Sequence, residues 1–142
     1  MIQDAKICNS VEEAMQEAFS IAVRGLASQD WKRCSISVVG DGNMCVWNLG
    51  RSGFHCAIGW LIPWENQCSV AEEDQNMSSV GRVVGLIPEL QGWIQHDSFH
   101  EFLRFMQLDH DISNDDGDMK VRFRVLGENF KLVWPSDVPA FD

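Results

Sequence analysis

Apolar residues return every three or four positions in two stretches of the chain, which is the spacing of a helix face. The first stretch covers 11–26 and follows a capping box at Ser10 and Glu13. The second covers 99–108, and Ser98–Glu101 forms a similar box at its start. We therefore predict an amphipathic helix in each stretch.

The remaining apolar segments give weaker patterns. Segment 54–62 is short, apolar and closed by a proline, so it is predicted as a short buried helix, and 80–87 is predicted as another. Segment 119–132 fits both a strand alternation and a helix spacing, and we favour the helix. The two prolines of 134–142 predict an extended tail.

One pair of segments has strand character. Residues 34–39 and 44–47 are β-prone, and 40–43 between them contains an Asp-Gly pair that favours a hairpin turn. The predicted fold class is therefore α+β: a single helix-rich domain with a small antiparallel β-hairpin. A chain of 142 residues is of the usual size for one domain, so the domain is expected to span 1–142.

Charge narrows the classes of partner. The chain carries a net charge of −10, and residues 72–142 hold 14 acidic against 6 basic side chains. Such a field repels nucleic acid and attracts cationic protein surfaces, so we expect a basic protein surface as partner and no direct nucleic acid contact. The alternative is that the charge serves solubility alone.

The sequence also bears on the compartment. It lacks a leader-like apolar stretch at its start and any run near the roughly 20 residues of a membrane span. Five cysteines, an odd number, favour reduced thiols. We expect a cytoplasmic protein with no membrane contact, and the sequence does not indicate its oligomeric state.

Two kinds of side chain are candidates for contact with the partner. One is a set of carboxylates in polar segments, which can face a basic surface, and the other is a pair of tryptophans beside prolines, which can anchor an interface. The tryptophans could instead cover the edge of the core. The candidates are Glu72, Glu73, Asp74, Asp115, Asp116, Asp118, Trp64 and Trp134.

Catalysis by a thiol is the alternative function. Cys56 near a predicted helix start, with His110 as base and Asp111 as orienting group, has the residue types of a cysteine-dependent hydrolase. The competing interpretation is that Cys56 is buried packing and that His110 ends a helix. No spacing in the sequence brings the three together, so we expect no catalytic residue and leave the hydrolase as the alternative.

Metal binding is not expected. His96, His100 and His110 with Asp97, Asp109 and Asp111 have ligand chemistry but no ligand spacing. The predicted acidic loop 109–118 resembles a calcium loop, yet it has Asp116 at the position of the turn glycine and Arg122 at that of the bidentate glutamate. We predict neither a metal nor a cofactor.

Several blocks resemble a family of small proteins from phages and bacterial mobile elements that has no assigned activity. The blocks are 56–63, a Cys-Ala-Ile-Gly-Trp-Leu-Ile-Pro string, together with 77–80, 88–90 and 102–111, which ends in His-Asp. His55 departs from a basic lysine in the family, and Ser78-Ser79 from a Glu-Gly pair. The resemblance implies a helix-rich domain with a hairpin and a phage or prophage origin, and hence a bacterial host whose basic protein surface would be the partner, but it supplies no activity. Together with the acidity, the tryptophan candidates and the lack of a catalytic motif, it leads us to predict a non-enzymatic interaction protein that inhibits a host defence or nucleic-acid-handling complex.

Overall fold

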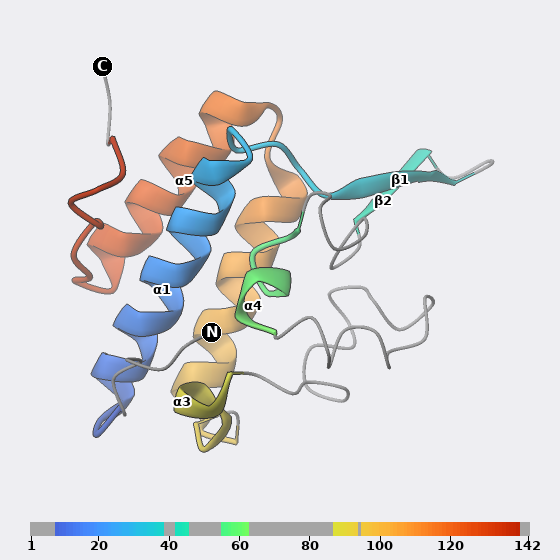
Figure 1. Ribbon diagram of the computed structural model, residues 1–142. Helices are drawn as coiled ribbons and strands as arrows, with labels where there is room; N and C mark the ends of the chain where they lie inside the picture. The colour runs from blue at the N-terminus through green and yellow to red at the C-terminus, as the bar shows by residue number, and fades with distance from the viewer. Residues whose placement is uncertain (1–7, 39–41, 46–54, 63–86, 94, 140–142) are drawn as a thin grey trace.

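The computed structural model describes residues 8–38, 42–45, 55–62, 87–93 and 95–139. Its helices are α1 (Val11–Ser28), α3 (Pro88–Gln91), α4 (Asp97–Ile112) and α5 (Asp116–Asn129). Two short strands, β1 (Ser35–Val38) and β2 (Gly42–Cys45), and a 3-10 turn, η1 (Gly59–Leu61), complete the described elements. Figure 1 shows α1, α4 and α5 side by side. Helices α1 and α4 begin at the same end, and α5 runs in the opposite direction.

The predicted first helix forms for the expected reason. The Ser10 side chain accepts a hydrogen bond from the Glu13 amide at 3.1 Å, and the Glu13 carboxylate accepts one from the Asn9 amide at 2.7 Å. The first bond satisfies a backbone donor that the first turn of a helix leaves unpaired, and the second ties the residue before the N-cap to that turn. One face of α1 is then buried, including Ala18, Phe19 and Leu26.

The described core is helical. Its largest fully buried side chains are aromatic residues of α1, α4 and α5 together with aliphatic residues of these helices and of the segments packed on them. They include Phe19, Phe99, Phe102, Phe123, Leu26, Leu103, Leu61 and Leu90. Burying side chains of this size supplies most of the hydrophobic stabilisation of a domain.

The predicted α+β class is wrong, because helices build the described core and the protein is mostly α. β1 and β2 are antiparallel, with Ser35 opposite Cys45 and Val38 opposite Gly42. Each has four residues, and Figure 1 shows the pair extending away from the helices. A two-stranded ribbon of this length does not define a second layer.

Some predicted boundaries are also wrong. α4 begins at Asp97 with His96 as its N-cap, so Ser98 lies inside the helix and not at its cap. Segment 54–62, predicted as a helix, contains in its described part only the 3-10 turn η1. Most of the predicted helix 80–87 lies outside the described residues, and the neighbouring helix α3 begins at Pro88, a position that proline favours.

Further along the chain, the helix favoured for 119–132 is confirmed as α5. The predicted acidic loop 109–118 is largely helical, because α4 continues to Ile112 and α5 begins at Asp116. No helix in the described part of the chain combines the length and apolar character needed to cross a bilayer.

Helices α1 and α5 end with the same motif. After α1, the amide of Trp31 donates to Leu26 O at 2.8 Å and that of Asp30 donates to Ala27 O at 3.0 Å. After α5, the amides of Leu132 and Lys131 make the equivalent pair of bonds. This is the Schellman motif, whose left-handed residue is usually glycine, and here it is Asp30 with φ 55° and Lys131 with φ 58°.

Candidate functional site

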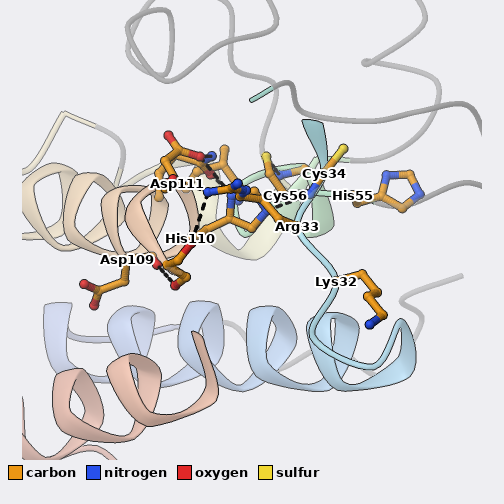
Figure 2. A network of polar contacts seen from close by, with 12 residues as sticks. Lys32, Arg33, Cys34, His55, Cys56, Asp109, His110 and Asp111 are labelled. Atoms are coloured by element: carbon orange, nitrogen blue, oxygen red, sulfur yellow. Dashed lines mark hydrogen bonds and ion pairs between the residues drawn. The ribbon is translucent and has the colours of Figure 1, made fainter. Parts of the chain in front are cut away.

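The structure brings Cys56, His110 and Asp111 into one cluster, which no spacing in the sequence indicated. Figure 2 shows them gathered where the end of α4 meets the chain at Arg33 and Cys34. Cys34, Cys56 and His110 are each 0% exposed. The cluster is therefore inside the protein and not on its surface.

Both ring nitrogens of His110 have partners. Its Nε2 accepts a hydrogen bond from the Cys34 amide at 3.0 Å, and its Nδ1 lies 2.8 Å from Asp111 Oδ1. A backbone amide can only donate, so Nε2 carries no proton and Nδ1 donates to the carboxylate. The hydrogen bonds thus specify a neutral imidazole with one tautomer.

Gln107 continues this network toward Cys56. Its Nε2 donates to Asp111 Oδ1 at 3.0 Å, and its Oε1 accepts the Ile58 amide at 3.1 Å. Gln107 is one turn before Asp111 on α4, so one helix face holds both the imidazole partner and the segment around Cys56. Arg33 adds a further link, because its Nη1 donates to the carbonyls of Asp111 and Ser113 at 2.9 and 3.1 Å.

The thiol of Cys56 is in a packing environment. Burial, followed by the neighbouring Cys34, raises the pKa of Cys56 well above its ordinary value of 9.0. The Gly59 amide donates to its sulfur at 3.2 Å, which lowers the pKa but is outweighed. A nucleophilic cysteine needs a lowered pKa and access to substrate, so the environment of Cys56 favours the neutral thiol.

These contacts decide what the cluster can do chemically. The lone pair of His110 Nε2 is directed at the Cys34 amide, so His110 cannot take a proton from Cys56 without breaking that bond. The cluster instead joins three segments that are distant in the sequence: residues 33–34 before β1, the turn at Cys56 and the end of α4. In this arrangement its role is structural, because its hydrogen bonds hold the three segments together.

A second buried glutamine holds the same turn from the opposite helix, and sequence reasoning missed it. Gln29 Nε2 donates to the carbonyls of Lys32 and His55 at 2.7 Å each. Its Oε1 accepts the His55 amide at 3.0 Å and the Trp60 indole at 3.2 Å. Gln29 and Gln107 therefore hold the segment 55–62 between α1 and α4.

Those carboxylates predicted for partner contact that the structure describes form hydrogen bonds and salt bridges within the protein itself. Asp115 caps α5 by accepting the Asp118 amide at 2.8 Å. Asp118 accepts the Asn114 amide and pairs with Arg122, both at 2.9 Å, which together lower its pKa. Asp116 pairs with Lys32. Glu72, Glu73 and Asp74 lie outside the described residues.

Of the two predicted tryptophan anchors, Trp64 lies outside the described residues. Trp134 is half-buried and stacks on Trp31 with ring centroids 5.9 Å apart. It also meets the edge of Phe19, and its indole donates to Val138 O at 2.9 Å. These contacts give Trp134 a packing role at the end of the core, while contact with a partner stays a prediction.

The histidines and aspartates considered for metal binding are spread out. His96 is at the N-cap position of α4 and packs on Trp93 with ring centroids 5.7 Å apart, whereas His110 is buried at the other end of the same helix. Within the described ranges, no three His, Cys, Asp or Glu side chains converge in a way that could hold a metal ion.

Three exposed carboxylates at one end of the bundle escaped the sequence reasoning. Glu12 is in the first turn of α1, Asp97 in the first turn of α4, and Glu101 one turn further. Figure 1 shows that these two helices begin at the same end. No salt bridge joins any of the three to a cation of the described segments. Asp97 and Glu101 also border a hollow of about 560 Å³ beside Phe105.

Comparison with known proteins adds no relative. No family model matches the chain, nor does any curated protein or solved structure.

Proposed function

We propose that this chain is a non-enzymatic interaction protein of phage or prophage origin, which binds a basic surface of a host protein in the bacterial cytoplasm. The host target would be a defence or nucleic-acid-handling complex, whose basic groove the carboxylates would occupy. The resemblance of blocks 56–63 and 102–111 supports the origin, and the net charge of −10 supports the sign of the partner.

The observation that carries the proposal is the contrast between the two groups of acidic side chains. Asp115, Asp116 and Asp118 are held by caps and cations of the protein itself. Glu12 and Asp97 are exposed, and among the described residues no cation forms a salt bridge with either, so their charge faces solvent on this part of the surface. Unpaired carboxylates speed the approach of a cationic partner and suppress wrong ones.

The hydrolase alternative loses its support from the buried cluster. Cys56 and His110 are inaccessible, the Cys56 thiol has a raised pKa, and His110 already uses both nitrogens. An active cysteine site requires an accessible thiol, a lowered thiol pKa and a base that is free to take the proton.

The test is capture of host proteins by the tagged chain at about 0.05 M and 0.5 M salt, which changes the screening length about threefold. We expect the wild-type chain to capture a host protein at low salt and not at high salt, and the Glu12→Gln/Asp97→Asn variant to fail to capture it at low salt. The matched control is Asp30→Asn/Asp116→Asn, which removes the same charge at the other end of the bundle and should retain capture.

Two outcomes would contradict the proposal. Capture that survives both high salt and the Glu12→Gln/Asp97→Asn pair would remove electrostatic recognition. Loss with the control pair alone would move the contact to the opposite end. A second readout uses the purified partner, whose association rate should fall more than its dissociation rate rises, because exposed charges act mainly on encounter.

A further inference from the structure

The outer face of α4 carries a row of exposed apolar side chains. Phe105, Leu108 and Ile112 are 41%, 38% and 46% exposed. They are three, then four, positions apart, which puts them on one stripe of the helix, on the side opposite the buried Leu103 and His110. Exposed apolar residues that are contiguous in this way mark an interaction surface more often than scattered ones do.

The charges beside this row are also ordered. Arg104 precedes Phe105 on one flank, and Asp109 follows Leu108 on the other. Arg104 is exposed and Asp109 is half-buried, with Arg122 of α5 as a nearby cation, but neither Arg104 nor Asp109 forms a salt bridge with the described residues. Phe105, Leu108 and Ile112 have the a, d and a spacing of a coiled-coil seam, and Arg104 and Asp109 then occupy the g and e positions.

From this pattern we infer that α4 binds the α4 of a second copy of this chain, side by side and in parallel. In a parallel pair, a g side chain lies opposite the e side chain five residues later in the other helix. Arg104 of each copy would therefore meet Asp109 of the other, and two-fold symmetry makes the contact twice. An antiparallel pair would bring like flanks together and leave both charges without complement.

The surface around the row has room for these contacts. Phe105 stands between two hollows, one of about 560 Å³ shared with Leu108 and one of about 250 Å³ shared with Val125 and Phe130. Side chains of a second α4 can enter such hollows as knobs enter holes. Glu101 takes the preceding d position, where two copies would repel, so the seam is confined to 104–112 and Glu101→Leu should tighten it.

The dimer goes beyond the proposed host contact and does not depend on it. Its test is sedimentation equilibrium of the purified chain. We expect wild type to dimerise, and Arg104→Glu and Asp109→Lys each to sediment as monomers, because each places like charges opposite one another. An equimolar mixture of these two variants should form a heterodimer, since its glutamate and lysine are complementary and its remaining Arg104 and Asp109 are too.

The double variant Arg104→Glu/Asp109→Lys should dimerise on its own for the same reason. Circular dichroism melting serves as the folding control for every variant, and Phe105→Glu should abolish association in all of them. A wild type that is monomeric at about 1 mM, where even a weak interface is half occupied, would overturn the inference. So would a mixture of the two single variants that stays monomeric, or single variants that both remain dimers.

Discussion

The three-helix bundle and the segment 55–62 are stable for different reasons. The bundle buries side chains that recur at helical spacing along each helix, such as Phe19, Phe102 and Phe123. The segment has one short 3-10 turn and is held by Gln29 and Gln107, whose amides bond to its backbone from 26 and 49 residues away. The helices of the bundle are determined by local sequence patterns, whereas the conformation of the segment depends on contacts with the helices around it.

Gly25 lies where the two regions touch, and Gly25→Ala should have the largest effect on stability. A β-carbon at this position would lie 2.3 Å from the Trp60 ring, so the ring or the helix must move. Moving Trp60 also breaks its bond to Gln29. We expect a loss of about 3 kcal/mol in the free energy of unfolding, measured by urea denaturation.

Gly92→Ala is the matched control, because among the described residues no atom beyond its chain neighbours lies within 4 Å of its β-carbon position, and its φ is −65°. It should change stability by less than about 0.5 kcal/mol. A Gly25→Ala variant as stable as Gly92→Ala would mean that the bundle and the segment do not pack tightly on each other.

Gln29→Leu comes next in size. It removes four hydrogen bonds, of which the two to the backbone of His55 are buried and the other two are part-buried. We therefore expect the free energy of unfolding to fall by about 2–3 kcal/mol. Gln16→Leu is the comparison, since Gln16 makes a similar pair of bonds to the backbone of Val133 but at the surface. Because water can replace those bonds, Gln16→Leu should lower the free energy of unfolding by less than about 1 kcal/mol.

Equal losses in the two glutamine variants would show that burial does not set the strength of these bonds. Urea denaturation again gives the values. Tryptophan fluorescence should report the change around Trp60 in Gln29→Leu alone, because only that variant removes the partner of its indole.

Cys56→Ser should lower the free energy of unfolding by somewhat less, about 1–2 kcal/mol, because it places a hydroxyl in a fully buried site. Cys56→Ala should lower it less still.

Wild type should also lose stability above pH 9.0, the ordinary pKa of the thiol. The folded pKa is raised, so the unfolded chain releases its proton first and unfolding is favoured as pH rises.

Denaturation at pH 7 and pH 10 measures this slope, and Cys56→Ala should flatten it. A wild type and a Cys56→Ala variant with equal slopes would mean that the buried thiol does not titrate on unfolding. Rapid reaction of folded Cys56 with a thiol reagent at low pH would be evidence for the hydrolase.

The same contrast separates what the sequence can predict from what it cannot. The capping box of Ser10 and Glu13 and the apolar spacing of 11–26 are local, so α1 was predicted with its start and core face. The hydrogen bonds of Gln107 and His110 join residues 49 and 76 positions apart, and no local pattern reports them. Cys56 was therefore singled out, while the contacts that settle its chemistry were not.

Two errors have a common physical cause. The Ser98–Glu101 box and the acidic run 109–118 were interpreted from local chemistry, but α4 begins at Asp97 and continues to Ile112. Burial of Phe99, Phe102 and Met106 on one face favours the longer helix over the local signal. Glu12 and Asp97, which form no salt bridge with the described residues, were missed because pairing is a property of the folded chain.

The smallest expected effect is a gain, at the end of α5. Lys131 has φ 58° in the left-handed region, which costs a residue with a β-carbon about 1 kcal/mol, whereas glycine adopts it freely. Lys131→Gly keeps both bonds of the Schellman motif, because they belong to the backbone. The more flexible unfolded chain offsets part of the benefit, so we expect a net gain of about 0.5 kcal/mol.

Lys120→Gly is the control, since Lys120 lies inside α5 and glycine should there cost about 1 kcal/mol. Lys131→Asn separates backbone from charge: asparagine tolerates the left-handed region but, like glycine, removes the cation near the helix end. A gain with glycine and a smaller gain with asparagine would establish the backbone cause, because both lose the charge. A loss with both would mean that the Lys131 charge, acting on the last carbonyls of α5, outweighs the strain in its backbone.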